Sequence, residues 1–510
     1  MAAKRPKNNG DGSQHVAPSA LWTRTSVAVL ACLVATATVL RFLFLVRKPF
    51  WFDECFSVEV ARLRWSDFFK LLWRREANMS LYYLLLRGWL HFGSSPFFIR
   101  SLSVIFSLAA LPAIFWLAGE LFDRRVGLLS ALLLTFNAYH IRYAQEARSY
   151  SLFVLLTILS SGFFIASLRE KPRYSRIGYV ITSVLAVYAH LYALLLLAAH
   201  WLSVRTPVGA NGTSCSRALR RAWIWIVVAS SPIVIFAAKT GAGPIRWIPK
   251  PGFHDVLEFA ESIAGNDGMV LLLIYIAACF SALATSRSPA TESFSNSSSS
   301  WQRWRLRFLL LWLLFPIVFV LLLSLARPLF LGRYFIFCLP PFVILAAAGI
   351  RQLRRVWLLV TAIVVLLSLR GTFSYYNHDF DLGRDGSEAA TNYVLDHSQP
   401  GDAILFHISE ARVPYEFFRS IRGAHGGPDI VYPRHGDRLD YRDFSGKPNA
   451  DLLRSLSARY SRVWVVLMSN EAAGLADATT VMVNQALSGT FVETEEEQFP
   501  EVEVRLYRRR

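Results

Sequence analysis

Two adjacent carboxylates stand near the start of the stretch WFDECFSVEVARLRWSDFFK, residues 51–70. Asp53 and Glu54 follow the first long apolar run of the chain, residues 25–46, and aromatic residues flank them on both sides. Ionisable groups at a bilayer boundary are costly to desolvate, so they are candidates for function. A carboxylate placed there can take a proton from a hydroxyl group. The alternative interpretation is an interfacial amphipathic helix with its aromatic rings at headgroup depth.

A second polar stretch, NAYHIRYAQEARSY, residues 137–150, follows the third apolar run. Uninterrupted helical spacing predicts one polar face there, made of Tyr139, Arg142 or Tyr143, Glu146 and Tyr150, with Arg148 pointing elsewhere. Arg142 and Glu146 also fit a plain i,i+4 ion pair at the end of a membrane helix. Because acids stand at the outer ends of two spans at one membrane depth, we expect them to share a cavity.

Basic and aromatic residues at the same predicted depth are candidates for holding an anionic group. Lys250 and Arg333 fall in predicted outer loops, where arginine offers a bidentate fork to a phosphate and lysine a point charge. His190 and Tyr192 lie at the outer tip of the YAHLY segment. Each cation alone is also explained by a lipid headgroup, and a lone histidine is commonly a structural hydrogen-bonding group. Together with a carboxylate base, such cations would suit transfer of a sugar carried on a lipid phosphate.

The composition predicts a polytopic membrane protein. Of the 510 residues, 54% are hydrophobic and only 18% are charged, and apolar runs recur along the chain. The formal net charge of +18 raises the question of nucleic-acid binding. The basic residues, however, gather between the apolar runs as the positive-inside rule predicts, so the expected partner is a lipid bilayer and not nucleic acid. The five scattered cysteines form no CxxC pair, which argues against a zinc site or a disulfide framework.

The apolar runs predict about eleven membrane spans. They cover residues 25–46, 97–120, 126–140, 151–168, two short spans within 177–204 that break near YAHLY, 222–238, 269–285, 308–326, 334–350 and 356–370. Basic residues near the N-terminus place that end in the cytoplasm and the first loop, residues 47–96, outside. This loop nevertheless carries many cations, so either the orientation is wrong or the loop attracts an anion.

Three parts are expected: a cytoplasmic tail (1–24), a transmembrane domain (25–370) and a soluble extracytoplasmic α/β domain (371–510). The last part alternates predicted helices with predicted strands, as small α/β domains do. The helices are expected at 387–396, 414–421 and 450–460, and the strands at 402–408, 429–432, 463–469 and 501–507, the last of them an edge strand. No GxGxxG follows the first strand, so nucleotide binding has no motif support.

Four segments resemble one known family. WFDECFS, QEARSY, AHLY and RYFIFCLPP are similar to the polytopic GT-C glycosyltransferases of the protein-mannosyltransferase and aminoarabinose-transferase type, in particular bacterial glycosyltransferase family 39. The resemblance covers residues 25–370 and implies a polyprenyl-phosphate sugar donor, inversion at the anomeric carbon and an active site at the outer face of the plasma membrane. It implies Asp53 as the catalytic base, with Glu54 assisting or organising the site. Arg142, Glu146 and Arg148, with His190 beside them, would then line the donor-phosphate or acceptor cavity.

Other interpretations stay open at this point. A transporter or flippase for an anionic lipid predicts charges near the midplane, interrupted helices and internal repeats, whereas here the charges cluster at one surface. An assembly scaffold would tolerate the loss of both acids. Paired acids can hold Mg²⁺ or Mn²⁺, although the surplus of cations argues against a metal. The acceptor is expected to be a lipid, a glycan or a protein, recognised by the C-terminal domain.

Overall fold

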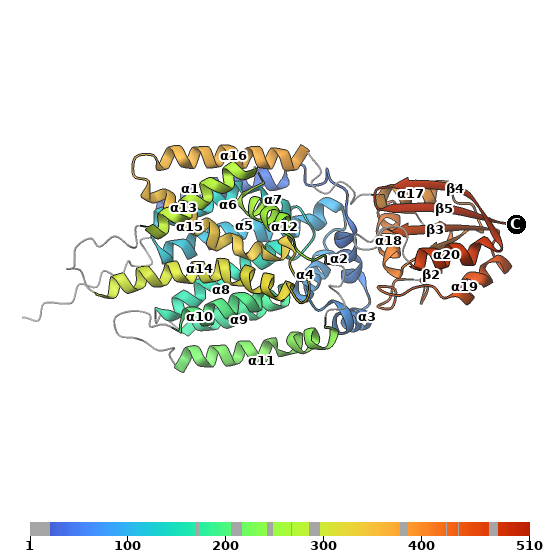
Figure 1. The fold of residues 1–510 in the computed structure, drawn as a ribbon, viewed down its shortest axis with the longest axis horizontal. Helices are drawn as coiled ribbons and strands as arrows, with labels where there is room; N and C mark the ends of the chain where they lie inside the picture. Colours follow the sequence, from blue (N-terminus) through green and yellow to red (C-terminus); the bar gives the residue numbers. More distant parts are fainter. Residues whose placement is uncertain are drawn as a thin grey trace, which may run out of the picture.

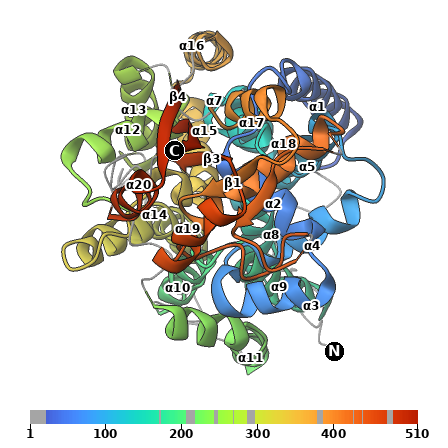
Figure 2. The ribbon, with the colours of Figure 1, turned by 90° about the vertical axis from the view of Figure 1, so that its right-hand side faces the viewer.

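The computed structural model describes residues 21–169, 173–205, 217–241, 248–266, 268–284, 296–377, 386–424, 426–436, 438–468 and 478–510. The predicted N-terminal tail lies almost wholly outside these residues. The described chain forms a bundle of long helices with a sheet domain at one end, and a group of short helices lies between the two (Figure 1). Seen from the C-terminal side, the sheet domain lies over the end of the bundle (Figure 2).

Within the described residues, seven helices are long and apolar enough to cross a membrane, or eight if one bent pair counts as a single span. The helices of this set are α1 (Arg24–Phe42), α5 (Pro96–Leu121), α8 (Tyr150–Leu168), α11 (Arg217–Thr240), α14 (Asn296–Ser324), η5 with α15 (Gly332–Cys338 and Leu339–Gln352) and α16 (Trp357–Asn377). The bent pair is α12 (Phe253–Ala264) with α13 (Gly268–Ala284), and its first helix lies in a stretch expected to be a loop. The predicted number of about eleven spans is therefore not confirmed.

Shorter helices account for the difference between the predicted spans and the long apolar helices of the structure. Residues predicted as the third span form α6 (Arg124–Phe136), and those predicted as a pair within 177–204 form α9 (Arg173–Ala189) and α10 (Ala193–Ser203). These helices have 13, 17 and 11 residues, fewer than about 20 for an untilted crossing. The break between α9 and α10 falls at His190, inside the YAHLY segment as expected.

The first loop holds four short helices between the bundle and the sheet domain (Figure 1). They are α2 (Phe52–Arg62), α3 (Trp65–Leu71), the π-helix η2 (Leu72–Glu76) and α4 (Ser80–Trp89). Asp53 and Glu54 occupy the first turn of α2, where the positive end of the helix dipole favours carboxylates. The first loop thus places both acids at the end of the bundle that faces the sheet domain.

The C-terminal domain is a five-stranded sheet between two layers of helices. Its elements are α17 (Gly386–His397), β1 (Ala403–Phe406), η6 (Ser409–Ala411), α18 (Arg412–Ile421), β2 (Asp429–Tyr432), α19 (Ala450–Ser455), η7 (Leu456–Ala458), β3 (Arg462–Met468), α20 (Ala478–Ser488), β4 (Phe491–Phe499) and β5 (Val502–Arg509). The strand order is β2-β1-β3-β5-β4, with β1 parallel to its two neighbours and β5 antiparallel to its own. Separate apolar clusters lie under α17 and α18 and under α19 and α20.

The α/β prediction is confirmed, but the edge strand was assigned wrongly. β5 pairs with β3 and β4, so it is an inner strand, and β4 forms the edge. The sequence FVETEEEQF does not predict β4. Seven of its nine residues are exposed, and its acids do not alternate with apolar residues as strand periodicity requires.

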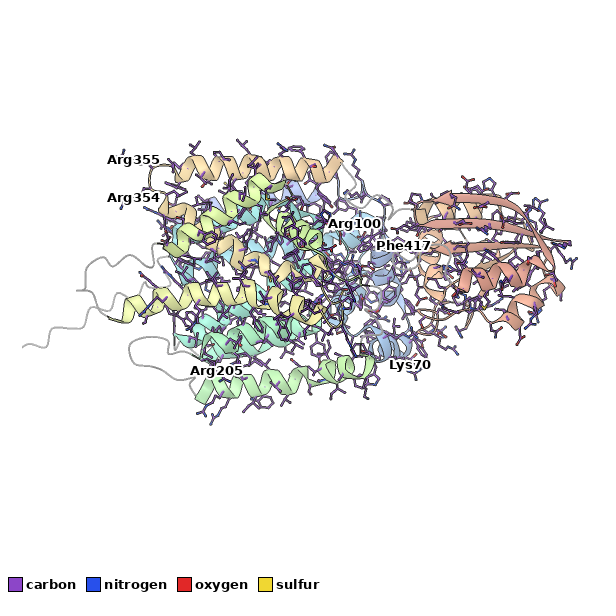
Figure 3. All side chains as sticks on the ribbon, viewed as in Figure 1. Lys70, Arg100, Arg205, Arg354, Arg355 and Phe417 are labelled. Carbon is purple, nitrogen blue, oxygen red and sulfur yellow. The ribbon has the colours of Figure 1, made fainter. Side chains whose placement is uncertain are left out.

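The sheet domain packs on the helix that carries the acids. Phe417 of α18 stacks on Phe50 with ring centroids 4.9 Å apart, and Phe444 meets Phe56 of α2 edge-on at 5.1 Å. Arg62 at the end of α2 donates a hydrogen bond to Ser420 Oγ at 3.4 Å. Figure 3 shows Arg100 and Phe417 near this junction, far from Arg205, Arg354 and Arg355 at the opposite end of the bundle.

Candidate functional site

The Asp53 carboxylate faces two guanidinium groups from distant parts of the chain. Its Oδ2 lies 3.3 Å from Arg148 Nη2 and 3.6 Å from Arg333 Nη2. Arg148 also donates hydrogen bonds to the Asp53 carbonyl and to Ser57 Oγ, each at 3.2 Å. The Asp53 side chain keeps 19% of its surface exposed, more than either arginine. Asp53 is therefore the more accessible acid of the pair, and two guanidinium groups flank its carboxylate.

Glu54 is in a different environment from Asp53. Its carboxylate is fully buried, and it receives hydrogen bonds from Arg100 Nε at 2.8 Å and Arg100 Nη2 at 2.6 Å. The backbone N–H of Ala147 donates to Glu54 Oε1 at 2.7 Å. Glu54 thus joins the start of α2 to the segment that carries Arg148. Whether Glu54 assists the chemistry or organises the site stays a prediction.

The stretch 137–150 does not form the continuous helix that the spacing predicted. Asn137 ends α6 and begins α7 (Ala138–Ala144), accepting a hydrogen bond from His140 N with its side chain, and residues 145–149 are irregular before α8. The prediction that Arg148 points elsewhere is therefore wrong, because the break turns its side chain toward Asp53. Glu146 instead pairs with Arg142 at 3.7 Å, as the plain ion-pair interpretation expected.

His190 and Tyr192 lie at the break between α9 and α10. The His190 ring is 1% exposed and stacks on Phe153 with centroids 5.0 Å apart. The charges of Arg148 and Arg333 both act on this ring. Tyr192 donates its hydroxyl hydrogen to Leu329 O at 2.7 Å, so it anchors the segment that leads to Arg333. The structure therefore brings His190 to the Asp53 site, with Tyr192 supporting it.

Arg333 and Lys250 have different surroundings. The Arg333 guanidinium lies 5.3 Å from the ring centroid of Trp51, two residues before Asp53, in addition to facing the Asp53 carboxylate. Lys250 is exposed just before α12, and among the described residues no hydrogen bond or ion pair joins it to Asp53, Arg148 or Arg333. The structure places Arg333 in the site and Lys250 outside the contacts that define it.

A third acid, Glu76, was missed in the sequence. It is the last residue of the π-helix η2, a rare conformation that recurs at functional sites. The pKa of Glu76 is raised to about 7, chiefly by burial; Arg148 and Arg75 act to lower it and the Asp53 carboxylate to raise it. Glu76 therefore belongs to the electrostatic surroundings of Asp53. The irregular helical register at η2 could not be read from the sequence.

Several buried polar atoms around Asp53 have no hydrogen-bond partner among the described residues. They are Arg148 Nε, Tyr150 Oη and His190 Nε2, while Asp53 Oδ2 has only its ion-pair contacts with the two arginines. Buried polar groups are nearly always paired, so each exception calls for an explanation. The charges of Asp53, Arg148 and Arg333 all act on Tyr150, and its ring centroid lies 6.5 Å from that of His190. The unpaired atoms thus gather at one place, where a polar ligand would satisfy them.

The adjacent acids do not suit a divalent cation. Arg100 and the Ala147 N–H already occupy the Glu54 carboxylate, and two guanidinium groups flank that of Asp53. A separate group in the C-terminal domain, His435, Asp440 and Asp443, has ligand atoms within 4.8 Å of one another. There His435 Nδ1 bonds Asp443 Oδ1 at 2.7 Å, and Arg442 bonds both oxygens of Asp440. These three residues could hold a metal ion, and each also has a protein partner in this structure.

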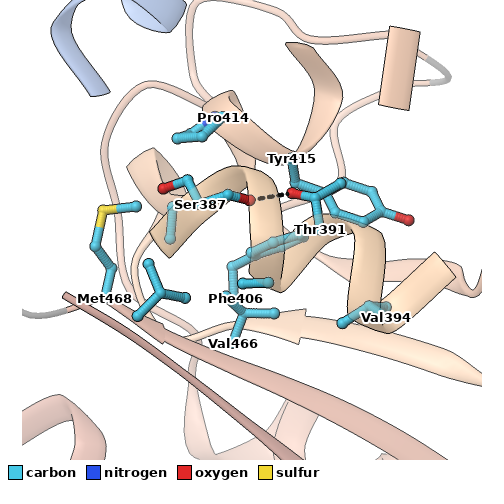
Figure 4. Close-up of a pocket in the computed structure, with 11 residues that line it drawn as sticks. Ser387, Thr391, Val394, Phe406, Pro414, Tyr415, Val466 and Met468 are labelled. Carbon is cyan, nitrogen blue, oxygen red and sulfur yellow. Dashed lines mark hydrogen bonds between the residues drawn. The ribbon is translucent and has the colours of Figure 1, made fainter. Parts of the chain in front are cut away.

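The C-terminal domain also contains a small, mostly apolar hollow (Figure 4). It lies between α17, α18 and the sheet, and Phe406, Val466 and Met468 form part of its wall. Thr391 donates to the Ser387 carbonyl at 2.7 Å, the bond drawn in Figure 4. The lining includes no charged side chain, so it lacks the groups that the Asp53 site offers.

Comparisons with known proteins bear on the fold. No protein-family model matches the sequence, and no curated protein does so. The structure is similar to ArnT from Cupriavidus metallidurans in the apo state, with a TM-score of 0.63, 12% identity, and coverage of 94% of this chain and 98% of that one. The structure of ArnT bound to undecaprenyl phosphate gives a TM-score of 0.63 at 13% identity. That match covers 95% of this chain and 98% of the ArnT chain.

A more distant similarity links the chain to an archaeal enzyme. The oligosaccharyltransferase AglB from Archaeoglobus fulgidus, in complex with an inhibitory peptide and a dolichol-phosphate, gives a TM-score of 0.52 at 9% identity. The match covers 92% of this chain and 73% of that one. ArnT is an aminoarabinose transferase, and both proteins are GT-C glycosyltransferases. The fold expected from the four sequence segments is therefore confirmed: this chain has the GT-C glycosyltransferase fold.

Proposed function

We propose that this protein is an integral-membrane glycosyltransferase that moves a sugar from a polyprenyl-phosphate donor to an acceptor hydroxyl. The observation that carries the proposal is the Asp53 carboxylate between Arg148 and Arg333, at 3.3 and 3.6 Å, beside buried polar atoms without partners. Undecaprenyl phosphate in ArnT and dolichol-phosphate in AglB support a lipid-phosphate donor for the shared fold.

Asp53 is the proposed general base. It accepts the proton of the acceptor hydroxyl while that oxygen attacks the anomeric carbon of the sugar. The bond from the anomeric carbon to the phosphate oxygen breaks, and the phosphate leaves with the electron pair. One displacement of this kind inverts the configuration at the anomeric carbon.

Arg148 and Arg333 would stabilise the charge that grows on the leaving phosphate. A guanidinium carries five N–H donors, so each arginine has the capacity to contact Asp53 and a phosphate oxygen together. Glu54 is a positioning residue in this scheme, because it holds the segment of Arg148 through Ala147. The pair of Arg142 and Glu146 would line the cavity, and Lys250 is retained only as a cation for the lipid phosphate.

The same scheme assigns the orientation of the chain. Arg205, Arg354 and Arg355 lie at the end of the bundle opposite the sheet domain (Figure 3), which supports a cytoplasmic location for that end. The Asp53 site and the domain 371–510 would then face the outside of the plasma membrane. The sheet domain packs on α2, the helix that carries Asp53. We therefore propose that this domain recognises the acceptor.

Turnover separates the enzyme from a flippase. Purified protein in lipid vesicles would be given radiolabelled polyprenyl-phosphate sugars together with a membrane extract as the source of acceptor. Transfer of label from the lipid to an acceptor is expected. Binding or transbilayer movement of the labelled lipid, with every sugar still attached after long incubation, would contradict the enzyme and favour the flippase.

A further inference from the structure

The His190 ring is held rigidly at the break between α9 and α10. It is 1% exposed, stacks on Phe153 with an interplanar angle of 17°, and has Tyr334 at a centroid distance of 4.9 Å. Asn78 fixes the same turn, because its Oδ1 accepts the Leu191 N–H at 2.9 Å. The direction in which each ring nitrogen points is therefore set before any ligand arrives.

One hydrogen bond determines which nitrogen carries the proton. His190 Nδ1 lies 3.2 Å from the backbone N of Tyr192 and accepts its hydrogen. A backbone N–H only donates, so Nδ1 has no proton, and the proton of the neutral ring resides on Nε2. A second proton would create a positive charge among Arg148 and Arg333, whose charges act on the ring. His190 is therefore a neutral donor through Nε2–H.

This donor has no acceptor within the described part of the protein. His190 Nε2 is buried without a hydrogen-bond partner, and so is Tyr150 Oη on a side chain that is 0% exposed. The two rings lie 6.5 Å apart, and the charges of the same two arginines act on both. An acceptor beside two guanidinium groups is most favourable when it carries negative charge.

We propose that His190 Nε2–H and the Tyr150 hydroxyl donate hydrogen bonds to phosphate oxygens of the polyprenyl-phosphate donor. His190 is then a neutral binding residue rather than a base or a cation. The inference rests on the proposed function and extends it by assigning phosphate contacts and a protonation state. The arginines supply the charge, whereas the two neutral donors, held in place by the protein, orient the phosphate.

Paired substitutions separate this role from a structural one. Glutamine places an amide N–H near the position of Nε2, whereas asparagine places its amide near Nδ1. The dissociation constant of undecaprenyl phosphate would be measured in detergent for wild type, His190→Gln and His190→Asn, with melting temperatures to check folding. We expect His190→Gln to bind within about threefold of wild type and His190→Asn to bind about tenfold or more weakly, as loss of a hydrogen bond to a charged group predicts.

Tyr150→Phe removes one oxygen and leaves the ring, so it tests the proposal even if the histidine variants fail to fold. Its affinity for undecaprenyl phosphate is expected to fall about tenfold. Equal affinities for His190→Gln and His190→Asn, or unchanged affinity in Tyr150→Phe, would overturn the assignment. Failure of the proposed function looks different, because wild type would then transfer no sugar from the labelled lipid, whatever its affinity for undecaprenyl phosphate.

Discussion

The Glu54 carboxylate and the Arg100 guanidinium form an ion pair with an Oε2–Nη2 distance of 2.6 Å, and both side chains are buried. Arg100 also donates to three carbonyl groups of the segment before α2, those of Leu45, Lys48 and Pro49. The pair therefore fixes where α2 begins, and Asp53 stands directly next to it. The two adjacent acids therefore lie in different surroundings: Glu54 is fully buried, and the Asp53 side chain is 19% exposed.

Glu54→Gln should destabilise the protein. Removing one charge of a buried pair leaves Arg100 uncompensated and costs about 3–5 kcal/mol. The melting temperature and the transfer rate are both expected to fall. Glu59→Gln is the matched control on the same helix, because Glu59 pairs with the partly exposed Arg62 and should cost less. A Glu54→Gln protein with the wild-type melting temperature but no transfer would instead make Glu54 part of the chemistry.

Glu76→Gln should stabilise the protein above neutral pH. The pKa of Glu76 is raised from 4.5 to about 7 by burial and by Asp53, so the native state holds its proton more tightly than the unfolded state. Wild type therefore loses stability as pH rises from 4.5 through 7, by at most about 3.4 kcal/mol. The glutamine variant lacks this loss, so the difference in melting temperature should grow between pH 5 and pH 8. A difference that is constant with pH would contradict the raised pKa.

Phe417→Ala should loosen the sheet domain from α2. Phe417 is fully buried against Phe50, and a buried phenylalanine truncated to alanine costs about 3–5 kcal/mol. Thermal unfolding followed by fluorescence would measure the effect, with the 80% exposed Phe92→Ala as the control. The double variant Phe50→Ala/Phe417→Ala should lose less free energy of unfolding than the two single variants lose in sum. Strict additivity would show that the stacked pair does not join the two domains.

Arg333→Lys should weaken donor binding without unfolding the protein. Lysine keeps the charge but lacks the fork of N–H donors that reaches two oxygens at once. The dissociation constant for undecaprenyl phosphate is expected to rise by about tenfold. Arg327→Lys, an exposed position shortly before η5, is the control and should bind as wild type does. Equal affinities in the two variants would remove Arg333 from the phosphate site.

Some of this arrangement could be predicted because it depends on local pattern. The acids after the first apolar run, the break at YAHLY and most strands of the C-terminal domain follow from hydropathy and turn-forming residues. Their placement at one end of the bundle followed from counting spans. The family segments then pointed to the fold that the solved structures share.

The rest depends on contacts between segments far apart in the chain. Arg148 turns toward Asp53 only because α7 ends at Ala144, and helical periodicity assumes that a helix continues. Arg100 lies in a long apolar helix, 46 positions from Glu54. The residues around Arg100 in the sequence therefore do not predict that Glu54 is its partner. Glu76 owes its place to the π-helix η2. In each case the partner is set by packing, which the linear pattern does not contain.

The most direct test of the central claim is single-turnover sugar transfer by Asp53→Asn. The variant removes the base but keeps the size of the side chain, so undecaprenyl phosphate should bind as it does in wild type. Asp67→Asn, on the same loop beside Lys70, is the control and should transfer normally. We predict that Asp53→Asn retains donor binding and loses at least about 100-fold in transfer rate. Transfer at the wild-type rate in Asp53→Asn would contradict the assignment of Asp53 as the base.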